Sequence, residues 1–276
     1  MDIMDLFISE GEEKKSNLIH YEGELGVFDY DPREFRIERL DDFDYLHYHG
    51  FGKSVDLPDG CINTRYMFYD CELPESFTLG KRFDTSNVTS MEHMFFNCNL
   101  PEGFSLGESF DTSNVTNMDG MFLGCELAED FTLGGKFDTS KVTAMCSMFE
   151  CSSLPDRFSL GKIFYTSSVI RMDAMFCGCK LPDGFSFGGH FDTSNVTSME
   201  HMFYECKLSN GFTLGKNFDI SNVRRMRGMF RDCDMPDNFY LGENFDISNV
   251  WHMEDMFIDC RYGGASIYDY FNILKI

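Results

Sequence analysis

Cysteine is the residue whose spacing most directly suggests chemistry in this chain. Stacked thiols could form disulfides or hold zinc, and one set recurs at 27-residue steps or multiples of them: Cys71, Cys98, Cys125, Cys179, Cys206, Cys233 and Cys260. Zinc sites use closely spaced pairs such as C-x2-C, and the sequence contains none. Because the total of 11 cysteines is odd and no compact disulfide framework is visible, we predict a buried column of reduced thiols.

The polar run Asp84-Thr85-Ser86-Asn87 places hydroxyl groups beside a carboxylate. Nucleophilic catalysis would require a histidine beside the serine, and a catalytic set normally occurs once. This run recurs along the chain without histidine as a constant partner. Short polar side chains also cap the free amides at the start of a helix, so we predict capping and no enzymatic activity. The N-x-T sequons at Asn87, Asn114 and Asn195 are by-products of the same run.

Methionine and histidine supply the remaining metal-binding residue types. Met91 and Met94 recur in each copy, but their spacing predicts a buried face on which flexible thioethers fill the core. His47 and His49 share one face of a predicted strand and have no carboxylate or cysteine companion. We therefore predict no metal site and no cofactor.

One unit, repeated without insertion, positions these residues. Its first phenylalanine recurs at 27-residue steps: Phe83, Phe110, Phe137, Phe164, Phe191, Phe218 and Phe245. The unit reads F-D-T-S-N-V-T-x-M-x-x-M-F-x-x-C-x-L-P-x-x-F-x-L-G-x-x. A degenerate copy precedes it, so we count about eight copies from about Asp56.

Each unit divides into a predicted helix and a predicted strand. The apolar residues after the polar run have helical spacing over about ten residues: Val88, Met91, Met94 and Phe95. Leu100-Pro101 would end that helix, and Phe104-Ser105-Leu106 alternates like a short strand. The predicted fold class is α/β, a leucine-rich-repeat-like solenoid of about eight 27-residue strand–helix coils with terminal caps.

The two ends of the chain depart from the repeat and predict caps. Residues 1–55 form the N-terminal cap, in which Phe35–Leu40 and Tyr45–His49 alternate like a pair of strands. Residues 56–260 form the repeat domain. Residues 261–276 form the C-terminal cap, and the apolar and aromatic segment from Ala265 to Ile276 predicts a final strand or helix. Such caps would cover the apolar surface and strand edge of an open coil.

The unit resembles the BspA-like leucine-rich repeat family of bacterial surface proteins, which also occurs in mycoplasmal lipoproteins. The resemblance rests on F-D-T-S-N-V-T-x-M-x-x-M-F-x-x-C at residues 83–98, 110–125 and 191–206. It covers about three quarters of the chain. It implies a leucine-rich-repeat solenoid, a role in binding or adhesion, and a place at the cell surface or outside the cell.

Two exposed features are candidate partner sites. The outward positions of the predicted strands form an uncharged stripe on the expected inner face of the arc: Thr78, Ser105, Thr132, Ser159, Ser186, Thr213 and Tyr240. Four cations fall in one repeat: Arg224, Arg225, Arg227 and Arg231. The alternatives are that the stripe reflects the β-propensity of threonine and that the arginines balance neighbouring acids. Otherwise the arginines mark a site for an acidic partner.

Charge and hydropathy restrict the class of partner. The net charge of -23 repels phosphate, which argues against binding of nucleic acid, and no apolar run is long enough to span a membrane. Residues 1–30 contain no basic region followed by an apolar stretch, so we expect a cytoplasmic location. We expect a monomeric, non-enzymatic interaction module that binds a protein or glycan. The alternative is a structural or self-assembling solenoid.

Overall fold

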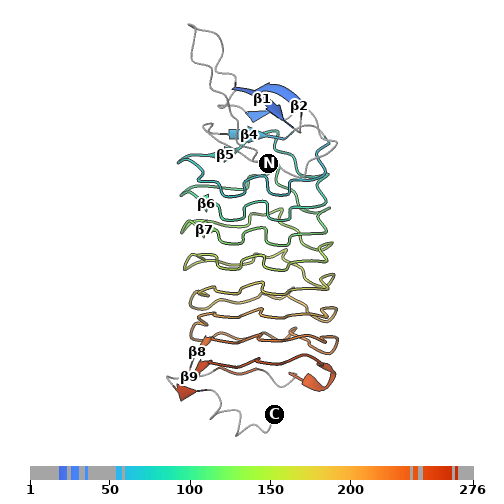
Figure 1. The fold of residues 1–276 in the computed structure, drawn as a ribbon, viewed down its shortest axis with the longest axis vertical. Helices are drawn as coiled ribbons and strands as arrows, with labels where there is room; N and C mark the ends of the chain where they lie inside the picture. The colour runs from blue at the N-terminus through green and yellow to red at the C-terminus, as the bar shows by residue number, and fades with distance from the viewer. Residues whose placement is uncertain are drawn as a thin grey trace.

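The chain forms a straight stack of flat coils (Figure 1). The computed structural model describes residues 19–23, 26–30, 35–36, 54–57, 60–236, 239–241, 245–262 and 265–266. Isolated parallel bridges connect equivalent positions of successive coils: Asn63, Ser90, Asn117, Ala144, Arg171, Ser198, Arg225 and His252. These eight positions are 27 residues apart, which confirms the repeat and its period.

Strands occupy little of each coil. The antiparallel pair is β1 (Ile19–Gly23) and β2 (Gly26–Tyr30). Parallel pairing joins β3 (Phe35–Arg36), β4 (Ser54–Asp56) and β5 (Thr78–Leu79), and also β6 (Asn99–Leu100) with β7 (Glu126–Leu127). At the other end, β8 (Asp234–Met235) pairs parallel with β9 (Arg261–Tyr262), and β10 (Ala265–Ser266) pairs antiparallel with β9. One short 3₁₀ helix, η1, spans Ile247–Asn249.

The predicted α/β class is wrong, because the described residues contain no α-helix. Hydrogen bonding in residues 91–98 shows why. The amides of Met91, His93 and Phe95 donate to carbonyls 26 residues later, in the next coil. The intervening amides of Met94 and Phe96 donate to carbonyls three residues earlier. Half of the bonds therefore join coils, whereas an α-helix would direct every amide four residues back.

Left-handed backbone at fixed positions produces this turn geometry. His93 and Asn97 both have φ of 54°, and the equivalent positions of other coils are also positive. Two successive turns place Met91, Met94 and Phe95 on the inside, at the spacing that one face of a helix would give. The spacing of the apolar residues is the same for these two turns and for one face of an α-helix. The sequence therefore favoured the helix, which is the commoner structure.

The predicted strand at Phe104-Ser105-Leu106 is also wrong. This segment lies between turns at 102–103 and 108–109 without strand pairing, and the Phe104 amide donates to the carbonyl of Pro101 at 3.1 Å. The extended pairing occurs earlier, at β6, where a helix end was expected. The helix-cap prediction fails for the same reason, because Asp84 accepts a 2.9 Å bond from the Ser86 amide in an Asx turn that no helix follows.

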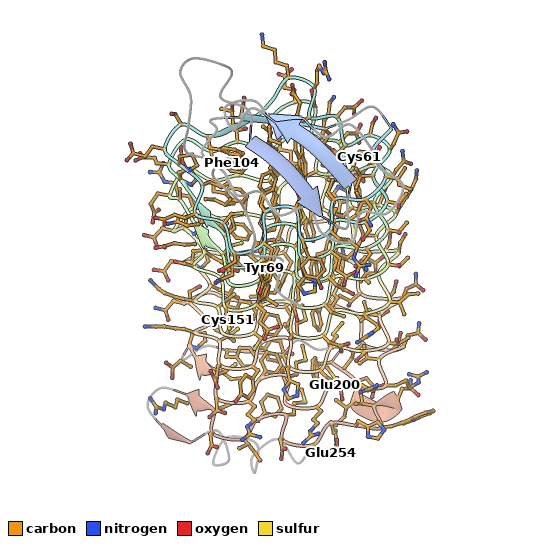
Figure 2. The ribbon with its side chains drawn as sticks, turned by 45° about the horizontal axis from the view of Figure 1, so that its top comes forward. Cys61, Tyr69, Phe104, Cys151, Glu200 and Glu254 are labelled. Atoms are coloured by element: carbon orange, nitrogen blue, oxygen red, sulfur yellow. The ribbon has the colours of Figure 1, made fainter. Side chains whose placement is uncertain are left out.

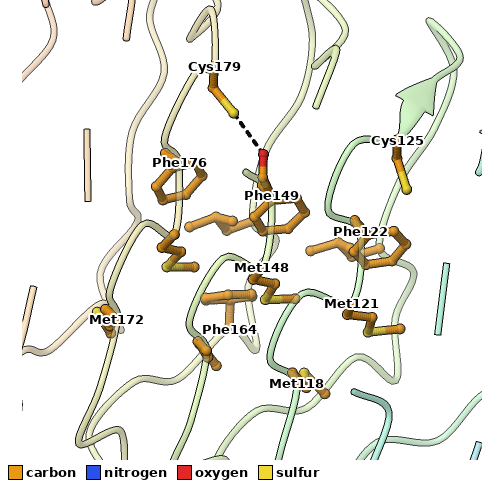
Figure 3. Close-up of a cluster of buried hydrophobic side chains, with 14 of the residues drawn as sticks. Met118, Met121, Phe122, Cys125, Met148, Phe149, Phe164, Met172, Phe176 and Cys179 are labelled. Atoms are coloured by element: carbon orange, nitrogen blue, oxygen red, sulfur yellow. Dashed lines mark hydrogen bonds between the residues drawn. The ribbon is translucent and has the colours of Figure 1, made fainter. Parts of the chain in front are cut away.

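Aromatic columns form the core. The rings of Phe83, Phe110 and Phe137 stack within 4° of parallel, with centroids 6.3 and 6.5 Å apart. A second column includes Phe122 and Phe149, whose rings stack with centroids 5.6 Å apart, and the buried Met121 and Met148 lie alongside it (Figure 3). The expectation that the repeated Phe and Met residues are buried is confirmed. Buried threonines add polar ties, since Thr85 donates to the Asp111 carbonyl in the next coil at 2.8 Å.

The ends agree in part with the sequence. β3 extends the parallel ladder at the N-terminal side, beginning at the predicted Phe35, and β10 begins the predicted final element at Ala265. Tyr45–His49, which includes His47 and His49, lies outside the described residues, as does 267–276. The cap function of both segments therefore stays a prediction.

Candidate functional site

The cysteine column is a structural element of the stack. Cys125, Cys179 and Cys206 are buried, and each thiol donates to a phenylalanine carbonyl 30 residues earlier at 2.7 or 2.8 Å. The bond from Cys179 to the carbonyl of Phe149 is drawn in Figure 3. Ser152 occupies the column in the coil that lacks cysteine there and donates to the Phe122 carbonyl in the same way. Each of these carbonyls also accepts from the amide three residues later, such as Cys98 to Phe95, so the thiol supplies a second donor that links one coil to another.

Burial holds these thiols in the protonated form. Desolvation raises the pKa of Cys125 to about 12, and it raises the pKa of Cys206 well above its ordinary value. The column cysteines are buried, as predicted, and no cysteine in the described residues is in a disulfide; that the thiols are reduced in the cell stays a prediction. Cys151 lies outside the column, is exposed, and occupies a left-handed turn position with φ of 55°. The column has no nucleophilic role because a buried, protonated thiol reacts poorly.

The predicted hydroxyl stripe is exposed along its whole length, from Thr78 to Tyr240. Only Thr78 lies in a strand. Ser105 and Ser186 accept bonds from the amides of Gly107 and Gly188, so part of the hydroxyl capacity stabilises local turns. Because the stack is straight in Figure 1, the stripe does not line the concave inner face that an arc would have.

Local carboxylates lie near three of the four arginines. Arg225 pairs with Glu200 at 2.5 Å, and Arg227 lies 4.0 Å from Asp255. Arg231 pairs with Asp232 at 3.3 Å and with Asp255 at 3.7 Å. These contacts neutralise much of the local charge across adjacent coils. Arg225 lies at a parallel bridge and Arg227 and Arg231 lie in turns, since the helix on which the four arginines were expected does not exist.

Arg224 differs from the other three arginines in its contacts. Its guanidinium donates to the carbonyls of Ser221 and Val223, each at 3.2 Å, and its Cζ lies 5.8 Å from the centroid of the Trp251 ring. It pairs with no carboxylate in the part of the chain that the structure describes. Its charge is therefore available to an anionic group.

Trp251 is the functional residue that sequence reasoning missed. Its side chain is 75% exposed, more than any other large hydrophobic residue in the described part of the chain. The available signal was its uniqueness, because it is the single Trp and occupies a position that is Thr in several other copies, such as Thr89 and Thr116. A hollow near the C-terminal end of the described stack is lined by Glu200, Arg225, Arg227, His252 and Glu254, and not by Arg224 or Trp251. Glu200 and Glu254 are labelled in Figure 2.

A second polar cluster occupies the equivalent columns of the middle coils. Asp173 accepts from the Arg171 guanidinium at 2.8 Å and from the Glu200 amide at 3.0 Å, and it also accepts from the Ser198 hydroxyl. Burial is the main cause that raises the pKa of Asp119. Burial and two nearby carboxylates raise the pKa of Cys146 to about 12. These bonds link successive coils, and the protonated thiol gives the cluster no activated nucleophile.

Two further features concern metal binding and membrane spanning in the described residues. No group of three or more His, Cys, Asp or Glu side chains in the described part of the chain is arranged to hold a metal ion. Among those residues there is also no helix with the length and apolar character needed to cross a membrane.

Comparison with known families identifies the class of protein to which the stacked coils belong. Residues 62–183 and 185–270 match the model of the family described as "Mycoplasma protein of unknown function, DUF285". Since the match covers most of the chain, the chain belongs to this family of repeat proteins. No curated protein and no solved structure matches it.

Proposed function

We propose that this chain is a non-enzymatic interaction module that binds a protein or glycan partner through one exposed face of its stack. The observation that carries the proposal is the pair formed by Arg224 and Trp251. Tryptophan and arginine are the residues most enriched at binding hot spots. Here Trp251 is exposed and Arg224 is half-exposed, in a chain whose net charge is -23.

The division between buried and exposed positions supports the same function. The buried Val, Met and Phe positions repeat from coil to coil, while the positions between the two methionines vary. Glu92-His93, Asp119-Gly120, Cys146-Ser147 and Asp173-Ala174 illustrate this variation. These positions are half-buried, apart from buried Gly120, and some, such as Asp173, bond to the next coil, so the fully exposed positions, such as Trp251, are the ones free to encode a partner.

The resemblance to the BspA-like family supports an adhesion-related role for this module. That role would place the chain at the cell surface or outside the cell, whereas its reduced cysteines favour the cytoplasm. Protease treatment of intact cells of the native host, followed by immunoblotting, distinguishes the two compartments. Loss of the protein from intact cells would indicate surface exposure, and protection until lysis would support the cytoplasm.

The binding face is tested by comparing the wild-type chain with its variants, both in capture of proteins from a lysate and in binding to a glycan array. We expect the wild-type chain to retain a partner that Arg224→Glu and Trp251→Ala lose, and raised salt to weaken that binding. Arg157→Glu is the matched control, because Arg157 is exposed in a distant coil and pairs with no described carboxylate. Equal binding by all variants would show that the partner uses another face, with the stripe from Thr78 to Tyr240 as the next candidate.

A further inference from the structure

Two cysteines outside the buried column meet at one junction between coils. Cys151 is exposed and Cys177 is half-buried, and neither is in a disulfide. The amide of Cys151 donates to the carbonyl of Cys177 in the next coil at 2.7 Å. The same bond recurs at other junctions, for example from Gly124 to the carbonyl of Glu150. Among the junctions that the structure describes, this one alone joins two cysteines.

That main-chain bond brings the two residues within the range of a disulfide. With standard backbone bond lengths and angles, an N···O distance of 2.7 Å limits the separation of the Cys151 and Cys177 Cα atoms to about 6.6 Å or less. Disulfides span Cα–Cα distances of about 4.4–6.8 Å. The backbone therefore accommodates a cross-link here without a change of register between the coils.

Gly178 leaves room for the Cys151 side chain to reach the next coil. A Cβ at Gly178 would lie 3.0 Å from the Cys151 Sγ and 3.5 Å from the Cys151 Cα. The thiol of Cys151, which is labelled in Figure 2, thus lies against the residue that follows Cys177. Because position 178 carries no side chain, rotation about the two χ1 angles can bring the sulfurs together.

The other cysteines lack this combination of exposure and a nearby thiol in the next coil. Column cysteines such as Cys179 are buried, and their thiols donate to main-chain carbonyls. Cys146 is half-buried, but its amide donates to Asp119 and its thiol lies 3.6 Å from an oxygen of Asp173. An oxidant in solution therefore reaches Cys151 first, and Cys177 is the thiol placed to react next.

We propose that Cys151 and Cys177 are an oxidative modification site, at which hydrogen peroxide forms a disulfide between adjacent coils. The Cys151 thiolate attacks one peroxide oxygen, the O–O bond breaks, and the leaving hydroxide takes up the proton lost by the thiol to form water. The Cys177 thiolate then attacks the sulfur of the Cys151 sulfenic acid. The S–S bond forms, the S–O bond breaks and a second water leaves. The two thiols lose two electrons, which the peroxide gains, and a small thiol reverses the step by exchange.

The surroundings of the pair select the oxidant and limit the rate. Burial and the carboxylates of Glu150 and Glu205 raise the pKa of Cys151, and the same causes raise the pKa of Cys177 to about 12. Little thiolate is present near neutral pH, so the pair responds to sustained oxidant and is no rapid redox catalyst. The carboxylates repel anionic disulfides, which favours uncharged peroxide. The site is separate from the Arg224–Trp251 face, so either proposal can fail alone.

Thiol counting and peptide mapping test the site in the full chain. After treatment with hydrogen peroxide and unfolding, free thiols should fall from 11 to 9, because one disulfide consumes two. A digest without reductant should contain one cross-linked pair of peptides, joined through Cys151 and Cys177, and dithiothreitol should restore all 11 thiols. A link from Cys177 to Cys179, or between column cysteines, would overturn the proposal. So would 11 free thiols after a treatment that oxidises the unfolded chain.

Single variants assign the order of the two steps. Cys177→Ser should leave Cys151 as a sulfenic acid that a 1,3-diketone probe traps, whereas Cys151→Ser should lose both the trapped species and the cross-link. Cys146→Ser is the matched control, because Cys146 is half-buried like Cys177, and it should cross-link as the wild type does. Oxidation should also raise the urea midpoint of the wild type and of neither cross-link variant. Equal trapping in Cys151→Ser, or loss of the cross-link in Cys146→Ser, would contradict the assignment.

Discussion

At the residue scale, glycine and histidine in successive coils are matched to each other. Gly120 and Gly228 have positive φ, and a Cβ at either would lie 2.6 or 2.7 Å from the ring of His93 or His201 in the preceding coil. The histidine ring therefore lies directly against the next coil. At these two places the ring occupies the space that a side chain of the next coil would need, whereas Tyr66 in the same column is followed by His93 and the two rings stack at 4.9 Å.

Gly120→Ala should destabilise the chain by about 1–3 kcal/mol, through both the His93 clash and the left-handed backbone. Urea unfolding measures the change. His93→Ala in the same background should recover the part due to the clash. Gly103→Ala is the control for backbone cost alone, because Gly103 has φ of 76° and no atom within 4 Å of the added Cβ. Equal costs at the two glycines would show that the histidine contact carries no strain.

Hydrogen bonding by the thiols also determines which substitutions the cysteine column should tolerate. Cys179→Ser should be tolerated better than Cys179→Val, because serine can still donate to the Phe149 carbonyl as Ser152 donates to Phe122. Valine removes this bond, and the Phe149 carbonyl then keeps only the Ser152 amide as its donor, so the loss should cost about 0.5–1.5 kcal/mol. Urea midpoints of the two variants compare the costs directly. A valine variant more stable than the serine variant would show that apolar packing dominates at this column.

The exposed cysteine should react with thiol reagents faster than the buried cysteines. Cys151 is exposed, whereas burial raises the pKa of Cys125 and Cys260 to about 12, so little of either is ionised near neutral pH. An aromatic disulfide reagent should label Cys151 first in the folded chain and the column only after unfolding. Raising the pH should speed labelling, because it increases the thiolate fraction. If the Cys151→Ser variant were still labelled rapidly while folded, the rapidly reacting thiol would be another cysteine.

At the scale of the element, the left-handed positions separate the observed turns from a helix. Ala174 has φ of 54° at a position where Gly120 and Gly228 stand in other coils. Ala174→Gly should therefore stabilise the chain by about 1 kcal/mol, because glycine adopts this conformation without the penalty of a Cβ. In a helix the same change would destabilise by a similar amount.

Thermal and urea unfolding give the sign of that change. Ala144→Gly is the matched control, since Ala144 lies at a parallel bridge and has no positive φ. We expect it to destabilise the chain by about 0.5–1 kcal/mol. If both variants were destabilised alike, the left-handed turn at Ala174 would be contradicted.

At the scale of the whole molecule, the stack behaves as a series of equivalent coils joined by neighbour contacts. Bonds run between residues 26, 27, 28 and 30 positions apart, as shown by Thr85 to Asp111, Thr116 to Thr89, Asn114 to Ser86 and Cys125 to Phe95. Removing a complete coil should preserve every type of contact. A change of one residue in its length should displace them all.

Deleting residues 110–136, one complete 27-residue coil, should give a folded chain with a cooperative thermal transition. The matched deletion of residues 110–135 should lose cooperativity or aggregate, because Met, Phe and Cys columns would no longer meet. Calorimetry and gel filtration compare the two. Equal behaviour of both deletions would show that coil register is not essential to the stack.

The sequence by itself determined the period, the number of coils, the identity of the buried columns and the free state of the cysteines. These follow from which residue types recur and at what interval. The left-handed positions were harder to recognise, because His93, Ser147 and Ala174 share no residue type, although each has positive φ. Their apolar neighbours have the spacing of a helix face. Local periodicity does not show which carbonyl accepts the hydrogen bond from a backbone amide.

Only the tertiary structure decided where those amides pair. The Phe95 amide finds its acceptor on Met121 in the next coil, and this choice replaces the predicted helix by stacked turns. Stacking also decided which cations are neutralised, since Glu200 approaches Arg225 only because one coil lies on the next. It also placed Arg224 against Trp251. These are contacts between residues distant in sequence. The repeat spacing determines which residues can meet in neighbouring coils, and the packing of the coils determines which contacts they form.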